Sequence, residues 1–361
     1  MRVVSVFLIA AGIAGAQATD PQQLFRDALA AQRRGDDALA IGKYREILKR
    51  YPDSVEVRAN LGAALAKLNR YDEAIEQYRA VLAKKDNAGL RLNLALAYYK
   101  KDAWRDAAQQ LNTLRTAQPD DLRMATLLAD CYTKLGEDNK AIAVLEPLEP
   151  RHRDDLSVEW LLGSALIRIG HNREGLDRVD YVARSGNRPE AYLLAGRTEL
   201  KLNEFERARD YAAAAAKLDP KLPGLDTLRG SVLSYLGDTE GAAASLRAAV
   251  AADPKDFEAQ LALGAVLHTI RDLDGAREHL QRALQLKADS TVARYEWARL
   301  ERTEGQLEAA TTDLEKVVHA DPNWAQPHVE LAALYFRLNR QQDGERERAL
   351  FDRLTAEQQK Q

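Results

Sequence analysis

Residues 189–222 read PEAYLLAGRTELKLNEFERARDYAAAAAKLDPKL, and this 34-residue stretch decides the fold. It holds two runs rich in alanine and leucine, separated by a turn at Asn203-Glu204, and it closes at Asp219-Pro220. Proline cannot continue a helix and disfavours helical geometry in the residue before it, so Asp-Pro predicts a helix end. The pair recurs 34 residues later at Asp253-Pro254, and 68 residues after that at Asp321-Pro322. A fixed period of this size predicts an array of helical repeats that stack to bury their apolar faces.

The composition favours helix and argues against several classes of function. The 361 residues are 46% hydrophobic but only 6% aromatic, and no stretch alternates as a half-buried strand does. The formal net charge of −3 gives no overall field that would attract nucleic acid, so we expect no such partner. Cys131 is the single cysteine, which excludes an internal disulfide. It occupies a position that is usually small, which favours a packed thiol over a reactive one.

Residues 1–18 differ from everything after them. Arg2 precedes an almost wholly apolar run that ends at Ala14, and small residues permit cleavage after Ala16 or Ala18. This pattern is typical of a secretory signal peptide, and the run is too short to span a bilayer. A buried first helix is the alternative. We therefore expect a periplasmic or secreted mature chain without a transmembrane segment, and without a lipid anchor because no cysteine follows the cleavage point.

Small residues recur at two fixed positions when Pro189 is counted as position 1 of its unit. Position 8 holds Ala28, Gly62, Ala95, Ala129, Gly163, Gly196, Gly230, Gly264, Ala298 and Ala332. Position 20 holds Ala40, Ala74, Ala107, Ala141, Gly175, Ala208, Ala242, Ala276 and Ala310. Such residues let two helices approach closely, and a leucine in their place would overpack the contact at a cost of about 1–3 kcal/mol. The turn between the two helices holds glycine in many units, as at Gly35, Gly136, Gly170, Gly237 and Gly305, which suits a left-handed helix end.

With these features the unit resembles the tetratricopeptide repeat, a helix-turn-helix motif of 34 residues. The resemblance covers residues 20–344 in about ten units. It implies an all-α fold, a right-handed superhelical α-solenoid. Residues 345–361 are expected to form a C-terminal capping helix and tail with a polar outer face. The sequence departs from the pattern at Arg151-His152-Arg153, where the closing proline is missing, and at Gly344, where alanine is expected.

The resemblance also implies where a partner would bind, because the first helices of such units line a concave groove. Position 13 then forms a cationic stripe of Arg33, Lys67, Lys100, Lys134, Arg168 and Lys201. The stripe suits an acidic peptide or an anionic polymer. The alternative is a solvated face near helix C-termini, where cations are favoured by the helix dipole and each exposed pair contributes little.

Other groove positions carry apolar residues and two asparagines. Leu96, Tyr99 and Trp160 are typical anchors for a partner segment, although they would equally suit packing within the stack. Asn60 and Asn93 occupy position 6, where relatives such as the O-GlcNAc transferase repeats hold a peptide backbone with a longer asparagine ladder. The predicted partner-binding groove comprises Asn60, Lys67, Asn93, Leu96, Tyr99, Lys100, Lys134, Trp160, Arg168 and Lys201.

The sequence lacks the motifs of an enzyme. The six histidines are scattered without metal-ligand spacing, and there is no phosphate-binding loop and no Gly-x-Ser-x-Gly. We therefore expect no catalytic residues, no cofactor and no metal. The expected function is a non-enzymatic scaffold that binds protein segments in envelope assembly or secretion. The alternative is a scaffold of a polysaccharide-export or cell-wall system, and an enzyme would need a catalytic cluster assembled across units.

Overall fold

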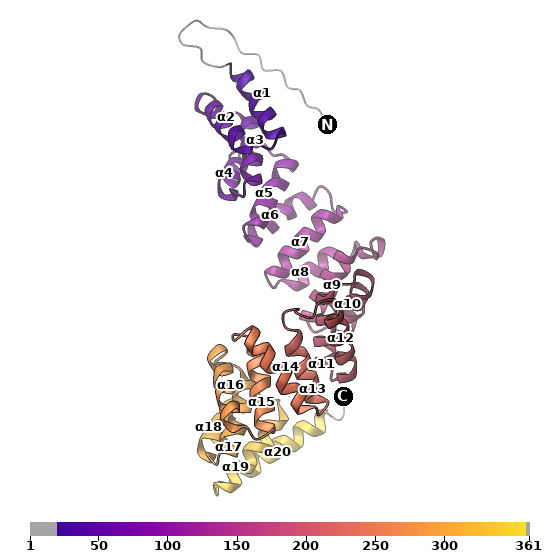
Figure 1. Cartoon of the computed structure of the whole chain (residues 1–361), viewed down its shortest axis with the longest axis vertical. Helices are drawn as coiled ribbons and strands as arrows, with labels where there is room; N and C mark the ends of the chain where they lie inside the picture. Colours follow the sequence, from indigo (N-terminus) through magenta and orange to yellow (C-terminus); the bar gives the residue numbers. More distant parts are fainter. Residues whose placement is uncertain (1–19, 359–361) are drawn as a thin grey trace. The chain divides into compact units, whose positions relative to one another are not determined.

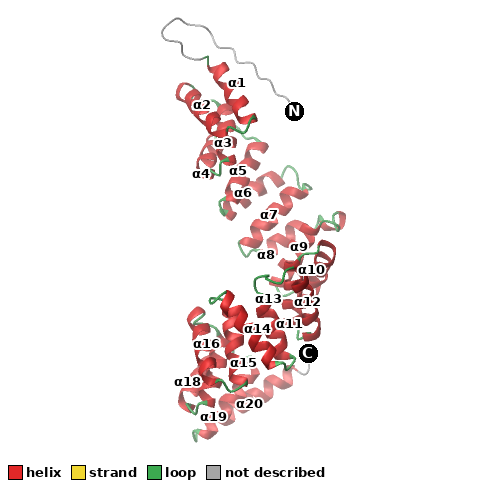
Figure 2. Cartoon of the chain, viewed as in Figure 1, coloured by secondary structure: helices red, strands yellow, loops and turns green. Residues whose placement is uncertain are grey.

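The computed structural model describes residues 20–358, which fold into α-helices joined by short turns, as Figures 1 and 2 show. No strand occurs in that range, so the predicted all-α class is confirmed. The expected signal peptide, residues 1–18, lies outside the described residues. Between residues 20 and 358, no helix has both the length and the apolar character that crossing a membrane requires.

The chain divides into two compact units, Met1–Gly170 and His171–Gln361. The first unit holds α1 (Pro21–Arg33), α2 (Asp37–Arg50), α3 (Val55–Lys67), α4 (Tyr71–Leu82), α5 (Ala88–Lys100), α6 (Trp104–Arg115), α7 (Leu122–Lys134), α8 (Asp138–Leu145), the 3-10 helix η1 (Glu149–Arg151) and α9 (Leu156–Arg168). The departure at residues 151–153 therefore corresponds to a shortened α8 followed by the 3-10 turn.

The second unit continues the same alternation of helices and turns. It holds α10 (Asn172–Gly186), α11 (Pro189–Lys201), α12 (Phe205–Leu218), α13 (Leu225–Tyr235), α14 (Thr239–Ala252), α15 (Phe257–Thr269), α16 (Leu273–Leu286), α17 (Thr291–Thr303), α18 (Leu307–Ala320), α19 (Ala325–Arg337) and α20 (Gln341–Gln358). The predicted boundary between residues 344 and 345 falls inside α20. The expected capping segment is therefore the C-terminal part of the helix that begins at Gln341.

The two small positions lie where the helices of each hairpin meet. A Cβ atom added at Gly62 would lie 2.6 Å from a ring carbon of Tyr78, and one at Gly264 would lie 2.6 Å from Cγ of Leu280. The alanines at position 20 are buried, with Ala208 fully enclosed. These distances are shorter than carbon atoms tolerate, so the small residues are required by the close helix contact.

The turns follow the predicted chemistry. Gly35, Gly136, Gly170, Gly237 and Gly305 all have positive φ, and the equivalent turns of other repeats place Asn69, Asp102, Asn203, Arg271 and Asn339 in the same left-handed region. At the unit ends, the Asp219 carboxylate accepts a hydrogen bond from the Lys221 N–H at 2.9 Å, and Asp253 does the same for Lys255 at 2.9 Å. Each Asp-Pro pair thus ends one helix and shapes the turn that leads to the next repeat.

Candidate functional site

Within each unit the first helices of successive repeats approach one another. Helix α3 contacts α5 and α7 contacts α9 in the first unit, while α11 contacts α13 and α13 contacts α15 in the second. Helices on the inner side of a curved stack lie closer together than those outside it. We call the surface formed by these helices the first-helix face, and nine of the ten predicted groove residues lie on its part in the first unit; Lys201 ends α11 in the second.

Position 13 of the first helix packs on position 17 of the preceding repeat. Lys67 Nζ lies 3.7 Å from the buried carboxylate of Asp37. Arg168 donates to the buried carboxylate of Asp138 through Nε at 2.8 Å and Nη2 at 2.7 Å. The predicted cationic stripe therefore serves in part to join one repeat to the next.

The same pairing of positions also occurs with aromatic residues. Lys134 Nζ lies 5.1 Å from the ring centroid of Trp104, an attractive cation–π geometry. In the second unit, Tyr235 occupies position 13, and its ring stacks on Phe205 at 4.7 Å with an interplanar angle of 5°. The contact between positions 13 and 17 is thus a recurring inter-repeat junction that accepts ion pairs, cation–π pairs or stacked rings.

A cluster around Tyr99 brings two predicted residues together. The Tyr99 ring packs edge-on against Trp104 at 5.0 Å, and its hydroxyl donates to the carboxylate of Asp130. Lys134 Nζ lies 3.9 Å from the same carboxylate. Burial, followed by the hydrogen bond to Asp130, raises the pKa of Tyr99 above its ordinary value, so the hydroxyl stays protonated. Trp104 and Asp130 were not identified from the sequence, because their contacts depend on how neighbouring repeats pack.

The other predicted residues differ in the exposure of their side chains and in their contacts within the chain. The amide of Asn60 donates to the backbone carbonyl of Glu56 at 2.9 Å, so it is engaged within its own helix. Trp160 is partly buried against the core cluster formed by α5 to α9, as the packing alternative expected. Asn93 is half-buried, whereas Lys100 and Lys201 are exposed. Leu96 is 40% exposed.

A second recurring feature, missed from the sequence, links positions 4 and 23 of the same repeat. Arg294 donates to the Ala288 carbonyl at 2.9 Å and to Asp313 at 3.1 Å. Arg58 likewise donates to the Pro52 carbonyl at 2.8 Å and to Gln77 at 2.7 Å. The position-4 side chain thereby clamps the preceding turn to the second helix. The same clamp pairs Arg91 with Gln110, Gln260 with His279, and His328 with Glu347.

The clamp is absent from the α11–α12 repeat, where positions 4 and 23 are both tyrosine. Tyr192 and Tyr211 face each other with ring centroids 6.3 Å apart. A hollow of about 490 Å³ opens beside them, lined by Arg184, Tyr192, Glu199, Arg207, Asp210, Tyr211 and Ala214. Helices α10, α11 and α12 each contribute to its wall.

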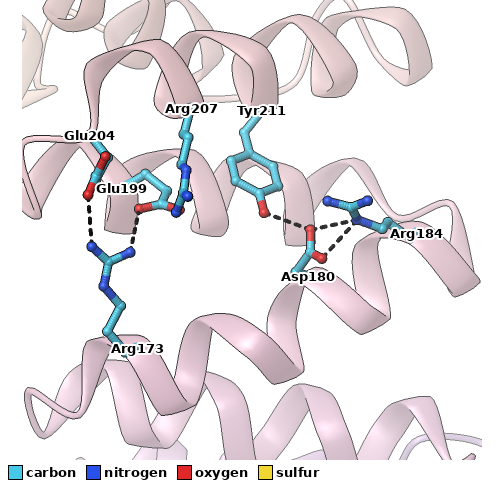
Figure 3. A network of polar contacts seen from close by, with 7 residues as sticks. All are labelled: Arg173, Asp180, Arg184, Glu199, Glu204, Arg207 and Tyr211. Carbon is cyan, nitrogen blue, oxygen red and sulfur yellow. Dashed lines mark hydrogen bonds and ion pairs between the residues drawn. The ribbon is translucent and has the colours of Figure 1, made fainter.

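Four of the residues that line this hollow belong to two polar networks, which Figure 3 draws. In the first, the Glu199 carboxylate lies 3.3 Å from Arg173 and 3.5 Å from Arg207, and Arg173 also reaches Glu204 at 3.0 Å. The Glu199 side chain is only 2% exposed. The arginines therefore supply the opposite charge that a buried carboxylate requires.

The second network holds Tyr211 in place. Its hydroxyl donates to Asp180 at 2.6 Å, and Arg184 Nε lies 2.8 Å from the other oxygen of that carboxylate. Burial, and then the hydrogen bond to Asp180, raises the pKa of Tyr211 to about 12. The ring is therefore a neutral and fixed wall of the hollow at physiological pH.

A buried charge network on the first-helix face of the second unit joins α17 to α19. The Tyr295 hydroxyl donates to Glu330 at 2.7 Å, and Arg302 lies 3.3 Å from the same carboxylate. Arg299 lies 2.8 Å from Glu296, and burial raises the pKa of Glu296. These charges compensate one another, so the network ties two repeats together.

The described residues offer little for metal or thiol chemistry. Among residues 20–358, no group of three or more His, Cys, Asp or Glu side chains could hold a metal ion. Cys131 is buried, and burial raises the pKa of its thiol to about 12. The thiol is therefore a packed side chain in its protonated form, as the sequence predicted.

These hairpins define an α-helical repeat protein whose repeats stack into two units. A family profile described as Tetratricopeptide repeat matches residues 25–89, 161–223 and 227–291, and a second profile with the same description matches 70–130. The chain belongs to the tetratricopeptide repeat family. Proteins of this fold are typically interaction scaffolds rather than enzymes.

Among curated proteins, the chain is similar to the Vi polysaccharide export protein VexE of Salmonella typhi, with 31% identity over 125 residues that span 33% of this chain and 19% of the relative. It is also similar to DnaJ homolog subfamily C member 3 of Gallus gallus, with 23% identity over 173 residues, 42% of this chain and 34% of that protein. The chain thus matches only a minor part of either relative.

Among solved structures, it resembles the APC/C hetero-tetramer Cut9-Hcn1, with a TM-score of 0.58 and 15% identity over 93% of this chain and 88% of that chain. A tetratricopeptide repeat protein from Parabacteroides merdae has a TM-score of 0.55 and 12% identity over 69% of this chain and 98% of that chain. At such identities the likeness establishes the fold alone.

Proposed function

We propose that this chain is a non-enzymatic scaffold that binds segments of partner proteins on the first-helix face of α5, in assembly or secretion within a bacterial envelope. The observation that carries the proposal is the pairing of Leu96, 40% exposed, with the exposed Lys100 one helical turn later. Residues four apart lie on the same side of a helix, so the two side chains offer an apolar anchor beside a positive charge. This combination suits an amphipathic segment with acidic residues.

Other cations of the stripe support this choice of α5. Lys67, Lys134 and Arg168 already contact Asp37, Trp104 and Asp138 of the preceding repeats. A partner would have to compete with those contacts, whereas Lys100 is exposed. The rigid stack also lowers the entropic cost of binding, because only the partner segment has to become ordered.

The test is capture of partners from an envelope extract of the source organism by the full chain and two variants. Leu96→Ser with Lys100→Glu alters the proposed surface. Leu39→Ser with Lys49→Glu makes the same chemical changes on the second helix α2, where Leu39 is 45% exposed and Lys49 is exposed. We expect the first variant to lose the captured proteins and the second to retain them. Hydrogen exchange should also show protection of α3, α5 and α7 in the complex. Equal capture by both variants contradicts the proposal.

Export is part of the proposal and has its own test. Residues 1–18 fused to a reporter that is active only outside the cytoplasm should give activity in a bacterial host. A fusion in which Arg2 and the apolar run up to Ala14 are replaced by a polar linker should not. Activity of both fusions, or of neither, contradicts a signal peptide at this end of the chain.

A second candidate function is a scaffold in polysaccharide export, and the similarity to VexE favours it. Deletion of the gene should then reduce surface polysaccharide without changing the set of envelope protein complexes. The opposite result favours the protein-binding role.

A further inference from the structure

The α11–α12 hollow is the one described place where a polar clamp gives way to two facing tyrosines beside an open volume. Its lining mixes hydrogen-bond donors with an acceptor: Arg184 and Arg207 can donate to a ligand, and the exposed Asp210 can accept. A volume of about 490 Å³ falls in the range of small-ligand sites. The chemistry of this lining restricts what can bind.

We propose that the hollow binds a carboxylated sugar residue of an anionic oligosaccharide. The apolar C–H face of the sugar ring would pack on the rings of Tyr192 and Tyr211, which present flat surfaces with polar rims. The sugar carboxylate would pair with the guanidinium groups of Arg184 and Arg207, whose side chains are 70% and 63% exposed. Its hydroxyl groups would donate to the carboxylate of Asp210, whose side chain is 72% exposed.

The same lining disfavours the simpler anions. A phosphate ion or an acidic peptide segment would pair with the arginines, but neither offers an apolar ring face that could pack on Tyr192 and Tyr211. A neutral sugar would keep the ring contacts and hydroxyl bonds but offer no anionic acceptor to Arg184 and Arg207. A sugar acid offers an acceptor for the arginines and donors for Asp210 in one ring.

The hollow is organised before any ligand arrives. Asp180 holds both the Tyr211 hydroxyl and Nε of Arg184, as Figure 3 shows. Arg173 holds Glu199, and Glu204 in turn pairs with Arg173. Because these contacts already fix the side chains, binding costs little further ordering.

This inference is independent of the surface on α5, and it gives the polysaccharide role a defined site. The two proposals can fail separately, because the hollow lies in the second unit and is tested with pure oligosaccharides.

The experiment is titration of the full chain with four probes: a galacturonic acid tetramer, a neutral maltotetraose, tetraglutamate and inorganic phosphate. Calorimetry measures affinity, and saturation-transfer NMR reports which ligand protons contact the protein. We expect the galacturonic acid tetramer to bind at least tenfold more tightly than each of the other three, since loss of a charge-assisted hydrogen bond costs about tenfold.

Three variants locate the binding. Arg207→Gln should weaken galacturonate binding about tenfold, and Arg247→Gln, an exposed arginine on α14, should leave it unchanged. Tyr192→Arg with Tyr211→Gln copies the Arg58–Gln77 clamp into the hollow, and should abolish binding while thermal unfolding shows a folded chain. The proposal is overturned if no probe binds, if tetraglutamate or phosphate binds as tightly as galacturonate, or if Arg247→Gln weakens binding as much as Arg207→Gln.

Discussion

The α17–α18 and α11–α12 repeats of the second unit share one packing scheme and contrast at positions 4 and 23. In α17–α18, Arg294 ties the preceding turn to Asp313, while in α11–α12 the tyrosines at the same positions leave a hollow. Both repeats keep small buried residues at positions 8 and 20, which set the approach of their helices. The contrast shows that the two small positions specify the hairpin, whereas positions 4 and 23 vary without changing it and are therefore available for function.

The largest expected effect tests what the two repeats have in common. Gly196→Leu in α11 and Ala298→Leu in α17 should each lower the free energy of unfolding by about 1–3 kcal/mol, because both sites are closely packed. At Gly196 even a Cβ atom would lie 2.7 Å from Leu228 Cδ2, and Ala298 is fully buried. Urea unfolding measures the change, with Ala244→Leu on the exposed side of α14 as the control. If only one of the two variants is destabilised, the repeats do not share a packing scheme.

A smaller effect should separate the two repeats. Arg294→Met removes the clamp and should cost about 1 kcal/mol, since Asp313 keeps its ion pair with Lys316 at 2.8 Å. Tyr192→Phe retains the ring contact with Tyr211 and should change stability by less than about 0.5 kcal/mol. For both variants, the measurement is the rate of amide hydrogen exchange in the turn that precedes the substituted repeat. Equal opening of the two turns contradicts a structural role for the clamp.

The features that could be predicted from the sequence are those set by residue type at one position. Gly196 and Ala208 had to be small, Gly237 had to adopt positive φ, and Asp253-Pro254 had to end a helix, and the structure confirms each. Such requirements depend only on the local backbone and on the other helix of the same hairpin. The residues that meet them therefore recur at fixed positions of each repeat in the sequence. The division into two units at Gly170 carries no comparable signal.

The candidate sites were less accessible to prediction because they depend on pairs of positions in different helices. The stripe at position 13 was identified, but its contacts with Asp37 and Trp104 require knowledge of which preceding side chain lies opposite. Pairs of polar residues 19 positions apart in the sequence, such as Arg58 and Gln77, indicate the clamp, but they were not identified from the sequence. The hollow could be predicted only once the clamp was known, because it occurs where Tyr192 and Tyr211 stand at the two positions that form the clamp in other repeats.

The smallest expected effect is a dependence of stability on pH. It distinguishes a repeat with a clamp from the α11–α12 repeat, because one clamp contains a histidine. His279 at position 23 of the α15–α16 repeat pairs with Gln260 at 2.8 Å, and burial lowers the pKa of its imidazole below the ordinary value of 6.5. The unfolded chain then binds the proton more readily than the folded one. This contribution to stability is therefore present above pH 6.5 and is lost as the pH falls below it.

Lowering the pH from about 7.5 to about 5.5 should accordingly weaken α15–α16, while α11–α12, which has tyrosines at positions 4 and 23, serves as the internal reference. Hydrogen exchange corrected for the intrinsic pH dependence measures both repeats in one sample. His279→Gln places at position 23 the residue that Gln77 and Gln110 supply elsewhere, so it should keep the clamp and remove part of the acid effect. His268 on α15, whose pKa is also lowered by burial, accounts for the remainder. An unchanged acid response in His279→Gln would show that His268 alone titrates, and that the clamp is insensitive to pH.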